Sequence, residues 1–132
     1  MTASIDSANC ICLSGEPYAA CCGRFHSGGA EAATAEQLMR SRYSAFALLD
    51  EGYLLRTHHA STAPKALDLD AAMDWRRLDI VATSGGGPFD TSGTVEFKAY
   101  YRRGSERGIL HESSRFVREG GRWLYVDGDI LA

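Results

Sequence analysis

The stretch that decides how the first part of this chain folds is Cys10-Ile11-Cys12-Leu13-Ser14-Gly15-Glu16-Pro17-Tyr18-Ala19-Ala20-Cys21-Cys22-Gly23. It holds all four cysteines of the sequence. Disulfides within each pair are disfavoured, because adjacent or nearly adjacent cysteines rarely reach the required Cα spacing and Cβ directions. Crossed pairings stay possible, although a reducing cytoplasm disfavours them. Two short thiolate pairs separated by a Ser-Gly-Glu-Pro turn suit one tetrahedral Zn²⁺ ion.

The sequence therefore predicts one structural zinc ion, bound by Cys10, Cys12, Cys21 and Cys22. Four thiolates leave no open position for water or substrate, so we do not expect a catalytic zinc. Iron is an alternative, because a four-thiolate site does not by itself distinguish the two metals. A second alternative is a set of unligated, buried cysteines. His26 could replace one cysteine, but a nearby histidine more often supports the ligands than joins them.

The length and charge of the chain limit the classes of protein to which it can belong. A chain of 132 residues with 45% hydrophobic residues is long enough for one folded, globular domain, with room for a small extra module. Its formal net charge of -3 lacks the basic excess that nucleic-acid binding favours, so nucleic acid is an unlikely partner. Residues 1–9 have neither a basic start nor an apolar run, and no later stretch suits a membrane span. We expect a cytoplasmic protein without a membrane partner.

The cysteine spacing Cys-x-Cys-x-Ser-Gly-x-x-Tyr-x-x-Cys-Cys-Gly closely resembles the SEC-C motif, the zinc-binding tail of the SecA translocation ATPase. The resemblance implies that the same four cysteines are the ligands, with Cys22 at a place that SecA fills with Cys or His. The SecA tail docks a chaperone and the ribosome and presents lysines around its tyrosine. Here those places hold Glu16, Pro17 and Ala19, so binding of the export chaperone is not carried over.

The resemblance extends to nearly the whole chain. Arg40–Phe46 and Phe116–Gly128 are similar to segments of the bacterial YchJ-like family. That family implies a SEC-C motif, here residues 1–29, followed by a domain similar to nuclear transport factor two (NTF2), here residues 30–132. The implied fold is a bent sheet wrapped round a helix to form a cone. The resemblance implies no reaction.

Residue patterns predict helices first and strands afterwards. Thr34 and Gln37 fit a capping box at the start of an apolar-periodic helix, and Gly52 is expected to end or break it. A short helix at 53–58 and a helical turn at 71–75 should follow. Period-two alternation then predicts strands from Arg76 to the loop at 84–88, and at about 94–101, 109–117 and 122–130, the last two joined by a Gly120-Gly121 hairpin. The fold class is α+β, with helices on one face of a curved antiparallel sheet of about four strands.

The cone could hold a pocket, whose titratable candidates are His111, Glu112 and Asp127. His111 and Glu112 are neighbours in a strand and should point to opposite faces, so they cannot converge on one proton. Each is more often exposed or hydrogen-bonded than a general base. Asp127 precedes a glycine and suits a turn or bulge. Possible pocket walls are Tyr43, Tyr53, Tyr101 and Trp75.

Other polar residues have simple structural interpretations. His58 and His59 diverge on a helix and are expected at the exposed end of the second helix. Three arginines could form a patch for an anionic partner, but the solvated face of a helix is the favoured interpretation. These are Arg40, Arg42 and Arg56.

Three functional hypotheses follow. The first is a protein-docking module for an unidentified partner, with a docking surface around Tyr18, Arg24 and Phe25. The second is a small-molecule-binding protein or enzyme that uses the cone, with an enzyme less favoured than a non-enzyme. The third is that the zinc only stabilises the fold of a domain whose function the sequence does not indicate. A pocket near His111 or Glu112 would favour the second, whereas a filled cone and an exposed aromatic patch on the metal-binding segment would favour the first.

Overall fold

The computed structural model describes residues 8–131. The expectation that residues 1–9 carry no targeting segment therefore falls almost entirely outside the described residues. No helix within the described range is long and apolar enough to cross a membrane. The elements are the 3-10 helix η2 (Tyr18–Ala20), the helices α1 (Cys22–His26), α2 (Ala35–Ala47) and α3 (Glu51–Arg56), and the strands β1 (Met73–Gly85), β2 (Ser92–Arg103), β3 (Glu106–Glu119) and β4 (Arg122–Ile130).

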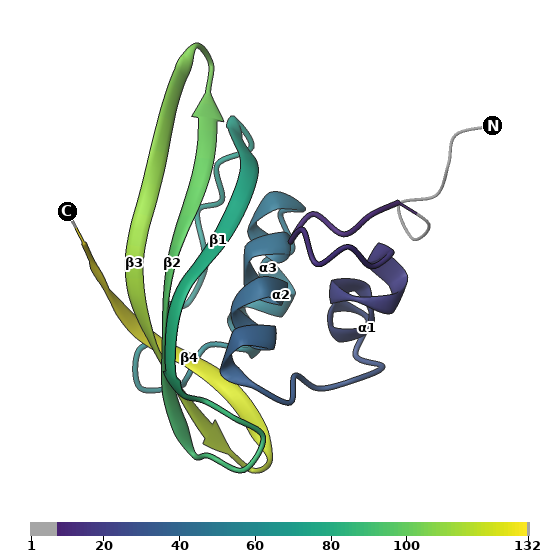
Figure 1. Cartoon of the computed structure of the whole chain (residues 1–132), viewed down its shortest axis with the longest axis vertical. Helices are drawn as coiled ribbons and strands as arrows, with labels where there is room; N and C mark the ends of the chain where they lie inside the picture. The colour runs from purple at the N-terminus through teal and green to yellow at the C-terminus, as the bar shows by residue number, and fades with distance from the viewer. Residues whose placement is uncertain (1–7, 132) are drawn as a thin grey trace.

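The strands form one antiparallel meander in the order β1-β2-β3-β4. Helices α2 and α3 lie along one face of this sheet, and α1 with the N-terminal loop lies on the far side of those helices (Figure 1). We call residues 8–26, which comprise this loop, η2 and α1, the knot. Gly120 and Gly121 join β3 to β4 with φ values of 58° and 78°, as the predicted two-residue hairpin requires. The α+β prediction is confirmed.

Helix α2 begins as predicted, and the Thr34 hydroxyl accepts a hydrogen bond from the Gln37 backbone N–H at 3.1 Å. The Gln37 side chain accepts from Ala33 N–H, one residue further out than in a capping box. The prediction that Gly52 ends this helix is wrong. Leu49, with a φ of 58°, turns the chain after Ala47, and Gly52 lies inside α3, whose start is capped by the Asp50 carboxylate.

The helical turn predicted at 71–75 is also wrong, because β1 already begins at Met73 and pairs with Arg103 of β2. The register shifts between Trp75 and Arg77. An extra residue at this point interrupts the period-two pattern, which is why the alternation becomes visible only after it. The Trp75 ring packs edge-on against Tyr101 of β2, at 5.4 Å between centroids, which anchors this early part of the strand.

The core lies between α2 and the concave sheet. Phe97, Ala99 and Phe116 of the sheet are all at most 3% exposed and share one buried cluster with Leu38 of α2. Burial of each large apolar side chain contributes about 1.5–3 kcal/mol. The indole N–H of Trp123 donates to the Ala33 carbonyl at 3.1 Å, which fixes β4 to the start of α2.

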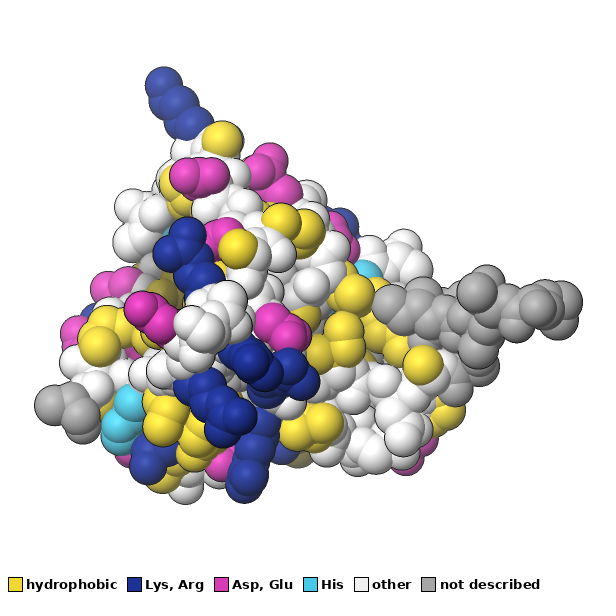
Figure 2. Space-filling view, turned by 90° about the horizontal axis from the view of Figure 1, so that it is seen from above, with side chains coloured by type: hydrophobic (Ala, Val, Ile, Leu, Met, Phe, Trp, Pro, Cys, Tyr) yellow, Lys and Arg dark blue, Asp and Glu magenta, His cyan; other side chains and the backbone are white. Residues whose placement is uncertain are grey.

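Basic and acidic side chains are mixed on the surface seen from the end of the sheet (Figure 2). On β1 and β2 each of three arginines pairs with an aspartate, so their charges are compensated locally. The pairs are Arg76–Asp74 at 2.9 Å, Arg77–Asp79 at 2.8 Å and Arg103–Asp70 at 3.0 Å.

Candidate metal centre and adjoining cavity

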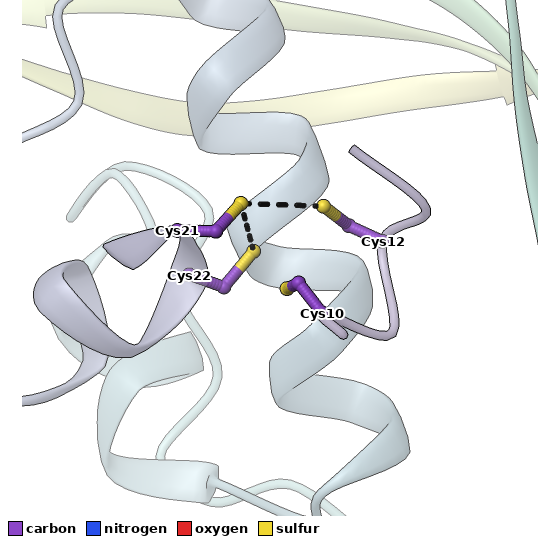
Figure 3. Close-up of side chains that lie close together, drawn as sticks. All are labelled: Cys10, Cys12, Cys21 and Cys22. Atoms are coloured by element: carbon purple, nitrogen blue, oxygen red, sulfur yellow. Dashed lines mark hydrogen bonds between the residues drawn. The ribbon is translucent and has the colours of Figure 1, made fainter. Parts of the chain in front are cut away.

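The four cysteine side chains point toward one centre, two from the N-terminal loop and two from the start of α1 (Figure 3). Their sulfur atoms all lie within 4.8 Å of one another. The Cys12–Cys21 distance is 3.6 Å and the Cys21–Cys22 distance is 4.0 Å. A tetrahedral zinc site with bonds of about 2.3 Å separates its sulfurs by about 3.8 Å, whereas a disulfide would bring them to about 2.05 Å. The geometry therefore fits a metal ion and not a disulfide.

The turn between the two pairs brings them together. Leu13 and Gly15 adopt left-handed φ values of 65° and 88°. The chain then reverses, so that Asn9 pairs with Pro17, and the Cys10 N–H donates to the Glu16 carbonyl at 2.8 Å. The Ser-Gly-Glu-Pro stretch thus has the reversing role predicted from its composition.

The centre is largely buried, and burial affects the acidity of its thiols. Cys10, Cys12 and Cys22 are at most 2% exposed, whereas Cys21 is partly exposed. Hydrogen bonds to the Cys10 and Cys12 sulfurs, followed by burial, hold the pKa of the Cys22 thiol well above its ordinary value. The hydrogen bond with Cys10 is also the main reason why the pKa of Cys12 is raised to about 11. A bound dication would stabilise the thiolates, and its binding would release protons.

Polar contacts fasten the knot to α2 and α3. The Arg40 guanidinium donates to the Cys12 carbonyl at 3.0 Å, and the Ser44 hydroxyl donates to the Cys22 sulfur at 3.2 Å. Arg56 donates to the Phe25 and His26 carbonyls. Arg40 and Arg56 therefore hold the knot in place and do not form the anionic-partner patch considered from the sequence with Arg42.

His26 uses both ring nitrogens for hydrogen bonds. Its Nε2 donates to the Ser41 carbonyl at 2.8 Å, and its Nδ1 accepts from the Tyr18 hydroxyl at 2.5 Å. This is the supporting role expected for it. The contact turns Tyr18 inward, and Phe25 is only 5% exposed beneath Arg24. Of the two aromatic residues expected on an exposed docking surface, Phe25 is thus buried and Tyr18 is partly buried.

A cavity of about 240 Å³ lies on the other side of α2, between that helix and the sheet. Tyr43, Trp75 and Glu112, which the sequence suggested for a pocket, all line it. Arg42 and His58, which the sequence did not suggest, line it too. The interior of the domain is therefore not completely filled.

The remaining pocket candidates lie elsewhere. His111 contacts Glu96 at 2.7 Å and does not line the cavity, so it and Glu112 use opposite faces of β3, as predicted. The Tyr53 hydroxyl bonds Ser41, and Tyr101 packs against Trp75 outside the cavity lining. Asp127 accepts from Arg115 beside a shift in the pairing of β3 with β4, which agrees with the predicted bulge position.

Arg42 is a buried cation in the cavity wall, contrary to the solvent-exposed position favoured from the sequence. It is 5% exposed, and its Nη1 donates to the Leu54 carbonyl and the Thr57 hydroxyl at 2.8 and 2.7 Å. The guanidinium carbon lies 4.6 Å from the centre of the Tyr125 ring. Burial lowers the pKa of Arg42 to about 10, so the group stays charged at neutral pH. Its helical position alone did not distinguish it from Arg40.

His58 is not at an exposed helix end, as the sequence suggested, because its ring packs edge-on against Tyr125 at 5.1 Å between centroids. Its Nε2 contacts the Thr62 hydroxyl at 3.1 Å. Its Nδ1 is buried and has no hydrogen-bond partner within the described chain. Burial, followed by the charge of Arg42, lowers the pKa of His58 below 6.5, so the ring is neutral at neutral pH.

The lowered pKa of His58 predicts a pH effect on stability. Protonation of this ring is easier in the unfolded chain, so its contribution to stability is complete above about pH 6.5 and is lost as the pH falls toward the folded-state pKa. Between about pH 7.5 and about pH 5.5, wild type should lose more stability than His58→Gln, as measured by urea unfolding. Acid effects at the cysteines are common to both proteins. Equal losses of stability in wild type and His58→Gln would contradict the lowered pKa of His58.

The Tyr43 hydroxyl is a second buried group without a hydrogen-bond partner among the described residues. Burial, with smaller effects of Asp74 and Cys12, raises the pKa of Tyr43 to about 12, so the hydroxyl keeps its proton. An unsatisfied buried polar group costs about 1–3 kcal/mol. The hydroxyl of Tyr43 therefore adds nothing to the stability of the folded chain through a hydrogen bond.

Tyr43→Phe should consequently leave the free energy of unfolding unchanged or raise it. Tyr53→Phe is the matched control, because Tyr53 is equally buried at 3% exposure but its hydroxyl bonds Ser41 at 2.7 Å. That control should lose about 1 kcal/mol. Urea unfolding of the two variants measures both values, and a clear loss in Tyr43→Phe would show that its hydroxyl is satisfied in the folded protein.

Family models match most of the chain. The model described as the SEC-C motif matches residues 7–24, and the model described as the YchJ, middle NTF2-like domain matches residues 34–128. A UPF0225 protein of Streptomyces coelicolor is 55% identical over 122 residues, which cover 92% of this chain and 95% of that protein. A UPF0225 protein of Ralstonia nicotianae is 49% identical over 142 residues, with 98% and 96% covered.

Two solved structures share the fold. A SEC-C motif containing protein from Rhodopseudomonas palustris superposes with a TM-score of 0.82 at 36% identity, covering 95% of this chain and all of that one. A sec-c motif containing protein from Psychrobacter arcticus gives a TM-score of 0.70 at 29% identity, covering 97% of this chain and 81% of that one.

Proposed function

We propose a function from the premise that this chain belongs to the UPF0225 family, with a SEC-C motif and a YchJ middle NTF2-like domain. The proposed function is that of a zinc-stabilised protein that binds a small molecule in its cavity. One observation carries the ligand-binding part. The cavity of about 240 Å³ is lined by Tyr43 and His58, each of which has a buried polar atom without a partner in the described residues. Apolar cavities with a few such polar groups are typical ligand sites.

The metal has a structural role in this proposal. Four convergent cysteines support a closed site without an exchangeable position, and the SEC-C match supports zinc. Iron is the other metal that four thiolates hold well, and the metal content distinguishes them. No disulfide joins the four cysteines, which fits the cytoplasmic location that we also propose, since a reducing compartment keeps them available to a metal.

Filling the cavity tests the ligand-binding part. Ala99 is 2% exposed and lines the cavity, so Ala99→Leu should occupy part of its volume. We expect small aromatic probes to shift NMR signals of the cavity residues in wild type and to have little effect on Ala99→Leu. Ala82→Leu is the matched control, because Ala82 is an exposed alanine of the same sheet. Absence of binding in wild type, or equal binding to both leucine variants, would contradict the proposal.

A docking role for an unidentified protein partner is the second candidate. The SEC-C match favours it, as does Leu13, which is 56% exposed on the knot and adopts a left-handed φ of 65°. This conformation is costly for a leucine and is often retained for function. In affinity capture, Leu13→Gly should lose the partner without losing stability. Retention of every captured protein by this variant would argue against docking through Leu13.

A further inference from the structure

We infer that the outer face of the sheet carries a second, separate binding site, which takes a small molecule that joins a phosphate group to a ring, as a mononucleotide does. The site is a hollow of about 560 Å³ where β2 turns into β3, beside the start of β1. Three arginines, Arg76, Arg102 and Arg107, line it together with Tyr100 and Ile109. Figure 2 looks onto this end of the sheet and shows Lys and Arg side chains gathered there. The volume lies within the range of about 300–1,000 Å³ typical of small-molecule sites.

This hollow is distinct from the cavity between α2 and the sheet. Side chains along a strand alternate between the two faces of its sheet. On β2, Tyr100 and Arg102 at even positions line the hollow, whereas Phe97 and Ala99 at odd positions line the cavity. The two sites therefore lie on opposite faces, and this inference goes beyond the ligand proposed for the cavity without depending on it.

Two of the arginines face each other across neighbouring strands. Arg102 of β2 lies directly opposite Arg107 of β3 in the register of the sheet. The Cβ atoms of such a pair are about 4.5–5.5 Å apart, and like charges in this arrangement repel each other. Neither arginine forms an ion pair within the described part of the chain, and Arg102 Nε donates to the Gly104 carbonyl at 3.1 Å. A bound anion would replace this repulsion with attraction to both side chains.

The charges around the hollow match a phosphate group. Asp74 lies opposite Arg102 in the pairing of β1 with β2 and forms an ion pair with Arg76 at 2.9 Å, so three arginines and one aspartate leave two positive charges. Glu106 lies opposite Arg103 and so belongs to the other face. A phosphate monoester carries about 1.5 to 2 negative charges at neutral pH. Arginine is also the side chain whose planar fork binds two phosphate oxygens at once.

The less polar part of the hollow lies next to the arginines. Tyr100 and Ile109 are opposite each other, two positions further from the turn and on the same face. Ile109 is 57% exposed, and the Arg77 guanidinium carbon lies 5.5 Å from the centre of the Tyr100 ring. A flat ring placed over these two side chains would remove apolar area from water while its phosphate reaches the arginines.

Adenosine monophosphate (AMP), adenosine and inorganic phosphate test the two parts of this inference. Each is titrated into the full-length, metal-loaded protein at low salt and followed by NMR chemical shifts. We expect AMP to bind more tightly than adenosine or phosphate and to shift the signals of Tyr100 and Ile109. Arg102→Gln and Arg107→Gln should each weaken AMP binding about tenfold, the loss expected for a hydrogen bond between charged groups.

Arg103→Gln is the matched control. Arg103 belongs to the same hairpin, and its replacement changes the net charge by the same amount. It lies opposite Met73 and Glu106 on the other face of the sheet, and it forms an ion pair with Asp70 at 3.0 Å. This variant should bind AMP like wild type.

Each contrary result overturns a defined part of the inference. Failure of AMP to bind the folded, metal-loaded protein would overturn the site. Equal weakening by Arg103→Gln would show that AMP responds only to net charge and would overturn its location in the hollow. Adenosine binding as tight as that of AMP would overturn the role of the arginines, and phosphate binding as tight as that of AMP would overturn the ring contacts.

Discussion

Cys22→Ser should lower the free energy of unfolding by about 4 kcal/mol or more, because it removes a ligand from a closed metal site. Cys22 is fully buried and belongs both to the cluster of four sulfurs and to α1. Its sulfur also accepts from Ser44 of α2. Without the metal, the knot keeps only its hydrogen bonds and the packing of a few side chains, chiefly Phe25, against the core. Urea unfolding, with metal content determined on the same samples, measures the effect.

Leu13→Ser is the control in the same loop, because Leu13 lies between the ligands but is 56% exposed. It should retain the metal and most of the stability. A strong chelator should bring wild type down to the stability of Cys22→Ser and should leave that variant unchanged. Wild-type stability in Cys22→Ser would show that the metal does not contribute to the fold.

Gly93→Ala should destabilise the protein by about 3 kcal/mol, because its new methyl group has no space. A Cβ at this position would lie 2.4 Å from the Gly86 nitrogen and 2.5 Å from the Gly86 Cα. Both are backbone atoms, so no side-chain rotation relieves the clash. The Gly86 carbonyl accepts from the first N–H of α2, that of Ala35, at 2.9 Å. Displacing Gly86 would therefore disturb the start of the helix that carries the site.

Gly52→Ala is the contrasting control. Gly52 lies in α3, and the nearest atom to an added Cβ, an oxygen of Asp50, is 3.8 Å away. Alanine in a helix should raise the free energy of unfolding by about 0.5–1 kcal/mol. Thermal unfolding of the two variants should therefore move in opposite directions. An unchanged midpoint for Gly93→Ala would mean that the β1–β2 loop can separate from α2 without cost.

Helix α2 links the metal centre to the cavity. Arg40 and Ser44 contact the knot, whereas Met39, Arg42 and Tyr43 line the cavity. A helix of 3.6 residues per turn separates these two sets of side chains around its axis. Fixing the knot against one side of α2 thus supports the wall of the cavity on another side.

Local signals were sufficient for much of this arrangement. The last strand was predicted at about 122–130 and is observed at Arg122–Ile130, because its start follows a hairpin whose two glycines allow positive φ. The convergence of the cysteines follows from their spacing and from one turn. These features depend on residues close together in the sequence.

The cavity could not be predicted in the same way. Arg42 lines it because the ring of Tyr125, more than eighty residues later, lies beneath its guanidinium. His58 lines it because β4 also brings Tyr125 against the imidazole. From the sequence, both polar residues were assigned to solvent. Their burial depends on tertiary contacts that no local pattern encodes.

The central claim is that four cysteines bind one structural zinc ion, and elemental analysis of the purified, reduced protein tests it most directly. We predict one zinc per wild-type chain and none in a Cys21→Ser, Cys22→Ser double variant. A folded, metal-free wild type would contradict the claim, and one iron per chain would overturn the assignment of zinc.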